Sequence, residues 1–278
     1  MVQVLRYHCS SCNALLKECE SLVDIGHVLE ECPSCGHLLS NNLTLCEPEL
    51  ASKVVPPFQT ADTMKGFTFD IKELDGFFYG FGAEDTLCIT GKKSNLISAR
   101  LCVRSLLPKR QGGLESSVLF IDAGNNSDVY QCVSFARQYG IAINRILDGI
   151  IVSRLFTIHQ LAHLVVHELP SAIRHFGTKL VVISGLLAMF IQDPQVNQKE
   201  AVKILDEIMQ TIDKISKTSF VIITVDEPST IYNKILTRFD NRLELTLTGN
   251  RIEVNAYCHN RFEAFSIPER DLHLIPTR

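Results

Sequence analysis

Residues 86–107 read TLCITGKKSNLISARLCVRSLL, and this stretch decides the predicted fold. Its first five residues, 86–90, form a short apolar run that is typical of a buried strand. Residues 94–107 then carry apolar side chains at helical spacing as far as Pro108, which does not continue a helix. A strand that leads directly into a helix is the first half of a strand–helix–strand unit, so the stretch predicts a parallel sheet.

The same alternation continues toward the C-terminus. We predict strands at 118–122, 150–152, 180–183 and 220–225, helices at 128–139, 157–175 and 198–217, and a closing hairpin with strands at 242–248 and 251–257. The pattern favours an α/β fold: a doubly wound, mostly parallel sheet with an antiparallel C-terminal hairpin.

Several residues predict where these helices begin and end. Asn126 or Ser127 is the expected cap of the helix at 128–139, and Gly140 is the expected stop. Pro170 lies inside the helix expected at 157–175, where its ring and missing N–H predict a kink or a split.

Two Cys-x-x-Cys pairs separated by nineteen residues mark the N-terminal region. Their cysteines are Cys9, Cys12, Cys32 and Cys35. Four thiolates at this spacing predict a tetrahedral structural zinc site, and zinc is the cofactor we expect. A region of about 45 residues buries little apolar surface, so the metal would supply folding free energy. The alternatives are two redox pairs without metal and a catalytic zinc, which four thiolates disfavour because they leave no open position.

The composition divides the chain into a zinc ribbon at 1–47, a linker at 48–66 and a core at 67–278. Within the ribbon, short strands are expected at 14–17, 22–23 and 27–29, and residues 41–57 look like connecting chain because they contain prolines and lack a hydrophobic period.

Charge and hydropathy limit the classes of function. The ribbon has two basic and six acidic side chains, and the rest of the chain has 25 of each, so charge does not predict strong nucleic-acid binding. No apolar run approaches the length of a membrane span, and the N-terminus lacks the apolar stretch of a secretion signal. With ten cysteines and one metal-type cluster, these features predict an intracellular protein of the cytoplasm, nucleoid or nucleus.

The order of these segments resembles the cores of RecA, RadA and KaiC-type recombinases. Residues 67–78, FTFDIKELDGFF, place Leu74 and Asp75 where the entry to such cores carries a Leu-Asp pair. Later segments of the resemblance are 118–140, 150–160, 180–190 and 238–247. A zinc ribbon ahead of such a core is similar to the bacterial RadA arrangement. The resemblance implies a RecA-like fold and a nucleotide site at the ends of the strands.

The phosphate-binding part of that site is altered in this sequence. A P-loop, G-x-x-x-x-G-K-[ST], wraps phosphates with backbone N–H groups. Gly91, Lys92, Lys93 and Ser94 imitate the end of the motif, but the position of the first glycine falls on Thr86, inside the strand. The loop is therefore too short for the usual cradle. The lysines at the start of a helix could still hold an anion, and the alternative is a solvated loop.

The catalytic positions implied by the resemblance are altered as well. Ser184 stands where a Walker B aspartate would orient magnesium, and Gly124 stands two residues after Asp122, where the family has its catalytic glutamate. Because phosphate cradle, metal anchor and general base fail together, we predict a chain that does not hydrolyse ATP, and ATP is not an expected cofactor. The acidic loop at 226–230 lacks the glycines of strand-exchange loops, so direct strand exchange is not expected.

Phe58-Gln59-Thr60-Ala61 lies between the ribbon and the core. RadA-type recombinases carry a Phe-x-x-Ala tether in this region, so the resemblance implies an oligomerisation role for Phe58 and Ala61. Local packing is the alternative interpretation of this segment.

These features favour a non-catalytic recombinase paralogue that acts as a scaffold or mediator in recombination and repair. Its expected partner is a recombinase or another RecA-like paralogue, in a homo- or hetero-oligomer, with weak DNA contact and no membrane contact. One alternative is a divergent ATP-binding repair ATPase or KaiC-like switch. Another is a zinc-ribbon adaptor of a transcription or RNA-modification assembly.

Overall fold

The computed structural model describes residues 5–9, 15–19, 43–45, 66–192, 197–225 and 235–274. The chain divides into two compact units, residues 1–63 and 64–278. In the first unit, β1 (Leu5–Cys9) pairs antiparallel with β2 (Leu15–Cys19) on one side and with β3 (Leu43–Leu45) on the other. The strand predicted at 14–17 corresponds to β2, whereas β3 lies within residues that we expected to be connecting chain. The strands predicted at 22–23 and 27–29 lie outside the described residues.

The second unit is built on an eight-stranded sheet in the order β11-β10-β9-β4-β8-β7-β5-β6. Its parallel strands are β4 (Thr86–Thr90), β5 (Val118–Asp122), β6 (Ile150–Arg154), β7 (Leu180–Ser184), β8 (Phe220–Val225) and β9 (Asn241–Thr248). The antiparallel strands β10 (Arg251–Cys258) and β11 (Arg261–Pro268) follow β9. This confirms the predicted mixed sheet, although the expected hairpin is a three-stranded meander.

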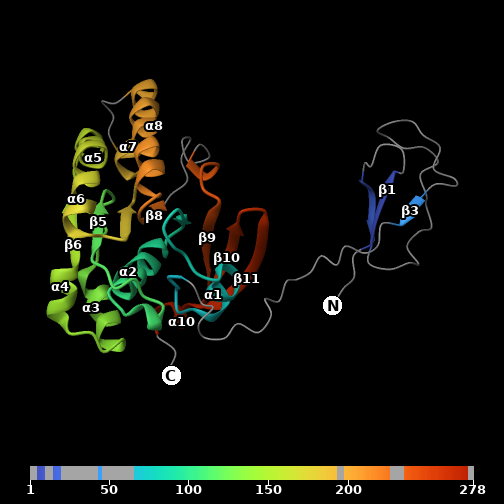
Figure 1. Ribbon diagram of the computed structural model, residues 1–278, viewed down its shortest axis with the longest axis horizontal. Helices are drawn as coiled ribbons and strands as arrows, with labels where there is room; N and C mark the ends of the chain where they lie inside the picture. The colour runs from blue at the N-terminus through green and yellow to red at the C-terminus, as the bar shows by residue number, and fades with distance from the viewer. Residues whose placement is uncertain are drawn as a thin grey trace. The chain divides into compact units, whose positions relative to one another are not determined.

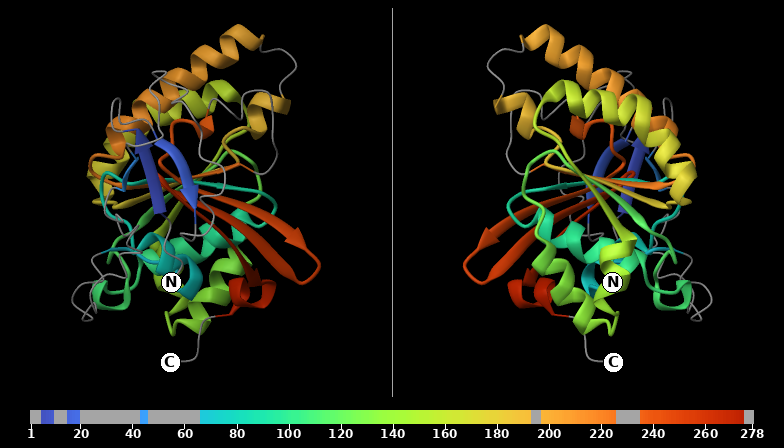
Figure 2. Two further views of the ribbon diagram at one scale, coloured as in Figure 1. Left: turned by 90° about the vertical axis from the view of Figure 1, so that its right-hand side faces the viewer. Right: turned by 90° about the vertical axis from the view of Figure 1, so that its left-hand side faces the viewer.

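Helices cover both faces of this sheet (Figures 1 and 2). One face carries α2 (Ser94–Ser105), α3 (Val129–Gln138) and α4 (Ile143–Gly149), and the other carries α5 (Ile158–His163), α6 (Leu169–Phe176) and α8 (Gln198–Ile215). Along β5, Val118 and Phe120 join the first core, while Leu119 and Ile121 join the second. The central strands β5, β7 and β8 are mainly apolar because both of their faces are buried.

The helix boundaries differ from the predictions in informative ways. The cap of α3 is Asp128 rather than Asn126 or Ser127, and its carboxylate accepts the N–H groups of Tyr130 at 2.8 Å and Gln131 at 3.3 Å. Gly140 ends the helix region with φ of 68°, as expected.

The predicted helix at 157–175 is split, as Pro170 suggested. A π-helical turn, Leu164–Glu168, separates α5 from α6, and Pro170 lies in the first turn of α6, directly after the π-helical turn. Shorter helices that were not predicted are α1 (Lys72–Phe78), α4, α7 (Ala188–Gln192) and α10 (Glu269–His273). In the described parts of the chain, no helix combines the length and apolar character needed to cross a membrane.

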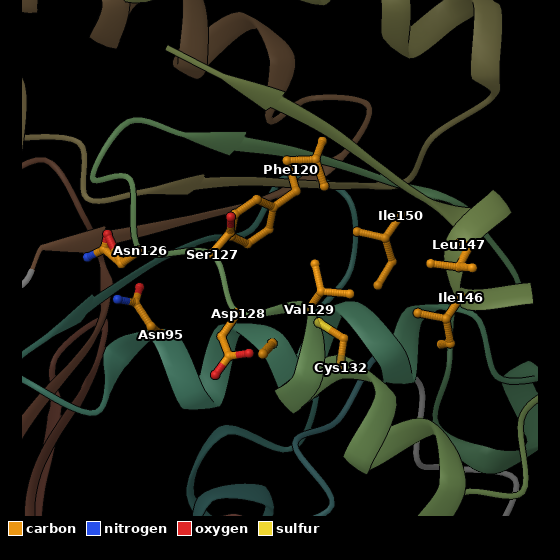
Figure 3. Close-up of a pocket in the computed structure, with 12 residues that line it drawn as sticks. Asn95, Phe120, Asn126, Ser127, Asp128, Val129, Cys132, Ile146, Leu147 and Ile150 are labelled. Carbon is orange, nitrogen blue, oxygen red and sulfur yellow. The ribbon is translucent and has the colours of Figure 1, made fainter. Parts of the chain in front are cut away.

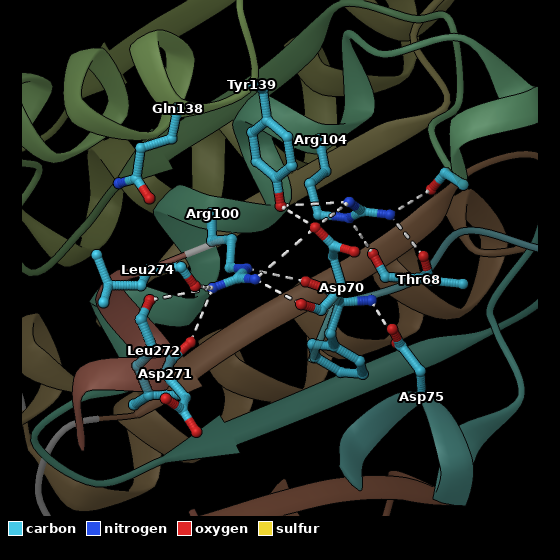
Figure 4. Close-up of polar contacts among 12 residues, drawn as sticks. Thr68, Asp70, Asp75, Arg100, Arg104, Gln138, Tyr139, Asp271, Leu272 and Leu274 are labelled. Carbon is cyan, nitrogen blue, oxygen red and sulfur yellow. Dashed lines mark hydrogen bonds and ion pairs between the residues drawn. The ribbon is translucent and has the colours of Figure 1, made fainter. Parts of the chain in front are cut away.

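Two fully buried arginines of α2 fasten the entry segment at 68–70 to the core (Figure 4). Arg104 donates to the Thr68 carbonyl at 2.6 Å, and its Nη1 lies 3.3 Å from the Asp70 carboxylate. Arg100 donates to the carbonyl oxygens of Phe69 at 3.0 Å and Asp70 at 2.5 Å. Charged side chains are rarely so deeply buried unless their donors are satisfied, and here backbone oxygens supply most of the acceptors.

Asp75, on α1 beside this network, predicts a pH-dependent stability. Burial raises its pKa from 3.8 to about 6, although the Phe69 N–H at 2.7 Å and the charge of Arg104 oppose the shift. The folded state therefore holds this proton more tightly than the unfolded state, and stability falls as the pH rises from about 4 through about 6. We expect Asp75→Asn to raise the free energy of unfolding by about 2 kcal/mol near pH 7.5 and to change it little near pH 4.

Urea unfolding of both proteins at the two pH values tests this expectation. Glu73→Gln, an exposed acidic position on the same helix, is the matched control and should show no such pH dependence. An equal gain from Asp75→Asn at both pH values would show that the carboxyl proton is not the cause.

Candidate functional site

The carboxyl ends of β4, β5, β7 and β8 meet along one edge of the sheet, where open α/β sheets bind their ligands. Asp122 of β5 and Ser184 of β7 are register partners, and Thr90 of β4 lies opposite Val225 of β8. The residues predicted to form an altered nucleotide site therefore lie at one edge of the sheet.

The turn after β4 is held by backbone hydrogen bonds and by close packing against neighbouring backbone. Gly91 has φ of 97°, and a Cβ added there would lie 2.1 Å from the carbonyl oxygen of Leu245. The Gly91 N–H donates to the Val225 carbonyl at 3.1 Å, and the Ser94 N–H donates to Gly91 at 3.0 Å. These N–H groups are thus used inside the fold, and Ser94, the first residue of α2, is fully buried.

The two lysines of this turn have different surroundings. Lys93, the cap residue of α2, lies 2.6 Å from the carboxylate of Glu269 in the C-terminal helix α10. This ammonium holds the pKa of Glu269 below its usual range. Lys92 is exposed. A carboxylate of the same chain therefore contacts one of the two lysines that could otherwise bind a phosphate.

The end of β7 carries an uncharged polar cluster. The Ser184 hydroxyl donates to Asn95 Oδ1 at 2.9 Å, and the Thr224 hydroxyl lies 3.4 Å from the same oxygen. The Gly185 N–H donates to the Thr224 hydroxyl at 2.9 Å. These groups satisfy one another, and the cluster supplies no carboxylate of the kind that orients magnesium.

Asp122 is fully buried and holds the loop that follows β5. Its carboxylate accepts the N–H groups of Asn126 at 3.0 Å and Ser127 at 3.3 Å, and it accepts from Arg154 Nε at 3.2 Å. Each of these bonds is charge-assisted, so the carboxylate is committed to the shape of the loop.

The two loops after β5 and β7 pack closely at a pair of glycines. A Cβ added to Gly185 would lie 2.6 Å from the Cα atom of Gly124, and Gly185 has φ of 68°. Gly124 is the position that the family resemblance assigned to a catalytic glutamate. At this point the backbone of residue 185 packs directly against the backbone of residue 124.

A pocket of about 120 Å³ lies beside this edge, between the sheet and helices α2, α3 and α4 (Figure 3). Its apolar lining comprises Ala99, Phe120, Val129, Cys132, Ile146, Leu147, Ile150 and Val152. Asn95, Asn126, Ser127 and Asp128 line it as well. Burial raises the pKa of the Cys132 thiol to about 11, so this side chain is neutral at ordinary pH. The pocket is suited to an apolar side chain.

The pocket adjoins β6, which is an edge strand. β5 pairs with one side of β6, and the other side has no strand partner among the described residues. Several large apolar side chains are exposed on β6 (Val152, 47%), just after it (Phe156, 72%), on α4 (Leu147, 59%) and on α3 (Tyr130, 88%). An open strand edge, an apolar pocket and exposed aromatic side chains together suit the docking of an extended peptide.

The predicted site residues have different outcomes. Gly91, Lys93, Asp122 and Ser184 lie at the same edge of the sheet, with the contacts given above. Of the four predicted zinc ligands, Cys9 ends β1, and Cys12, Cys32 and Cys35 lie outside the described residues, as do Phe58 and Ala61. Within the described residues, no group of three or more His, Cys, Asp or Glu side chains is arranged to hold a metal ion. The zinc site and the tether therefore stay predictions.

The pocket and its edge strand were not predicted from the sequence. The pocket lining comes from α2, β5, α3, α4 and β6, and β6 is an edge only because of the strand order. One available signal was the apolar side chains of Val129 and Tyr130 at the start of α3, where a solvated helix terminus would carry polar residues.

Comparisons with known proteins agree with this fold. Residues 85–245 match the family model described as Rad51. The chain is similar to the DNA repair and recombination protein RadA of Cenarchaeum symbiosum (strain A), with 30% identity over 91 residues, which are 32% of this chain and 22% of that protein. It is also similar to the meiotic recombination protein DMC1 homolog A of Oryza sativa subsp. indica, with 27% identity over 118 residues, 40% of this chain and 34% of that protein. The matched segments thus span 22% to 34% of these relatives.

Proposed function

Because the chain belongs to the Rad51 family, we propose that it acts in DNA recombination or repair as a non-catalytic member, a scaffold or mediator that works through protein contacts. The observation that carries this proposal is the pairing of an apolar pocket with a β6 edge that has no strand partner in the described parts of the chain. Such a surface binds a neighbouring chain by adding a strand to the sheet, and the pocket adds specificity for one side chain.

The strand ends support the non-catalytic part of the proposal. The N–H groups of Gly91 and Ser94 donate within the fold, the Ser184 hydroxyl donates to Asn95, and the Asp122 carboxylate accepts from the loop that follows β5. Phosphoryl transfer depends on phosphate cradling, a metal anchor and an oriented water. These functions would require Gly91, Ser184 and Asp122 to face a ligand. Each of the three instead contacts a partner inside the fold.

The occupant that we propose for the β6 edge is an extended segment of a recombinase-family neighbour or of a second copy. Its backbone would pair with β6, and one apolar side chain would enter the pocket. This chain's own Phe58-Gln59-Thr60-Ala61, outside the described residues, has the composition of such a segment. It is therefore the probe with which to examine the site.

A labelled peptide with residues 54–65 is titrated into the full-length chain that carries Phe58→Ala, so that its own segment does not compete. We expect saturable binding by fluorescence anisotropy, and protection of the β6 amides from hydrogen exchange when the peptide is bound. The same peptide with Phe58→Ala is the control and should bind much more weakly. Equal binding of both peptides, or none of either, contradicts the proposed docking site.

We also propose that the first unit holds one structural zinc ion through Cys9, Cys12, Cys32 and Cys35. Cys9 ends β1, and Cys12 lies in the connection that leads to its antiparallel partner β2. Four thiolates are a donor set that zinc prefers, and a small unit gains folding free energy from the bound metal.

Native mass spectrometry of the purified full-length chain should find one zinc ion per chain and its loss in Cys32→Ser. Cys46→Ser, which removes a cysteine of the same region that lies outside both pairs, should keep the metal. Zinc retained by Cys32→Ser, or absent from the unmodified chain, would refute this assignment.

A further inference from the structure

The last described residues of the chain pack against α2 and α3 (Figure 4). α10 (Glu269–His273) follows β11, and its Leu272 side chain is only 1% exposed. The Gln138 amide of α3 donates to the His273 carbonyl at 2.9 Å. Glu269 contacts Lys93 at the start of α2 at 2.6 Å. We call residues 269–274 the C-terminal strap.

Arg100 joins the strap to the entry segment through one planar group. Its Nη1 donates to the carbonyl oxygens of three strap residues: Asp271 at 3.1 Å, Leu272 at 3.3 Å and Leu274 at 3.0 Å. Its Nε and Nη2 donate to the carbonyl oxygens of Phe69 and Asp70 in the entry segment. The guanidinium is rigid, so all of these bonds depend on a single position of the group.

Opening of the strap would therefore disturb the entry segment. Arg100 is 1% exposed, and without the strap its Nη1 loses the three acceptors recorded above while it stays buried. A buried cation without acceptors is costly, so the guanidinium would turn toward water. That movement breaks its bonds to Phe69 and Asp70, because the plane moves as a unit.

The second arginine does not replace these bonds. Arg104 holds Thr68, together with the Gln111 and Gly112 carbonyls at 3.2 and 3.3 Å. Its closest carboxylate, Asp70, is also 3.9 Å from Arg100, so one acidic side chain lies beside two buried cations. The carbonyl oxygens of the strap carry partial negative charge and also stabilise the Arg100 cation. Some of them are carbonyls at the C-terminal end of α10.

We propose that the strap is a conformational device: when it is closed over α2, Arg100 fixes the entry segment, and when it opens, residues 67–72 lose their order. The start and the end of the second unit thus respond together, although they lie far apart in sequence. A protein that captured the strap would loosen the point where the preceding chain joins the core. This inference does not depend on nucleotide binding or on the β6 docking site.

Hydrogen exchange of the full-length chain, read by mass spectrometry, tests the coupling. The amides of Phe67, Thr68 and Phe69 donate within the fold at 2.7, 3.2 and 2.7 Å, so their protection reports the order of the entry segment. Leu272→Ala weakens the strap, and we expect exchange at 67–72 to accelerate about thirtyfold or more. Leu169→Ala, a similarly buried leucine of α6 in the other core, is the control and should not affect these amides selectively.

A second pair of variants tests whether Arg100 is the link. In the Arg100→Lys background, Leu272→Ala should add little further acceleration at 67–72, because lysine does not bridge the two segments. If Leu272→Ala does not yield a folded chain, Glu269→Gln is used in its place. We then expect exchange of the amides at 67–72 to accelerate about two- to fivefold. Faster exchange of the strap with unchanged exchange at 67–72 would overturn the proposal, as would full additivity in the Arg100→Lys background.

Discussion

Arg104→Met is expected to lower the free energy of unfolding by more than about 4 kcal/mol. The substitution keeps an unbranched apolar stem in place and removes only the guanidinium. The carbonyl oxygens of Thr68, Gln111 and Gly112 would lose a donor, and the Asp70 carboxylate would lose its nearest cation at 3.3 Å. Each buried acceptor without a partner costs about 1–3 kcal/mol, so the losses together exceed the cost of an ordinary core substitution.

Urea unfolding monitored by circular dichroism measures this loss. Arg110→Met, which makes the same substitution at an exposed position a few residues away, is the control and should change stability by less than about 0.5 kcal/mol. Arg104→Lys should fall between them, because it keeps the charge and supplies fewer donors in a different geometry. A fully stable Arg104→Met chain would show that these bonds contribute little net free energy.

Leu147→Glu is expected to weaken binding of the 54–65 peptide by about thirtyfold or more. Leu147 lines the pocket and is 59% exposed, so the substitution places a charge at the docking surface without disturbing the core. Burying that charge beneath a bound segment requires its desolvation, which opposes binding. Fluorescence anisotropy with the Phe58→Ala chain as receptor measures the change in Kd.

Leu247→Glu is the matched control for this prediction. Leu247 is 44% exposed on β9, and four strands of the sheet lie between β9 and β6. The control should bind the peptide as the parent chain does, and both variants should unfold at similar urea concentrations. Equal weakening by the two substitutions would mean that the peptide responds to net charge instead of to this pocket.

Much of the architecture could be predicted because the buried strands are apolar and short. The strand expected at 86–90 is β4, the one at 118–122 is β5, and the one at 220–225 is β8. These segments lie between two helix layers, so both faces of each strand are selected for burial. A short, continuous apolar run between turn residues is therefore enough to predict each of these strands.

Other elements could not be predicted because their patterns are weak. β11 was missed since the side chains at 261–264 are exposed and show no buried alternation. α4 has seven residues and a single buried side chain, Ile146, which is too little for a helical period. The strand order is also absent from local patterns, so the sequence offered no means to identify β6 as an edge.

The candidate site shows the same division between local and global information. The positions of Gly91, Asp122 and Ser184 at one edge of the sheet followed from the strand ends. Their partners did not, because Asn95 and Arg154 reach them only through the folded arrangement. The ion pair between Glu269 and Lys93 joins residues that are far apart in sequence. No local sequence pattern could therefore have predicted it.

The central claim is that the residues at the strand ends stabilise the fold and do not bind a nucleotide. Calorimetric titration of the full-length chain with a non-hydrolysable ATP analogue tests this claim most directly. With and without magnesium, we predict no saturable heat at concentrations up to about 1 mM, the weak end of specific binding. Magnesium-dependent binding that disappears in Lys93→Ala would contradict the account, because it would show that the short turn still encloses a triphosphate.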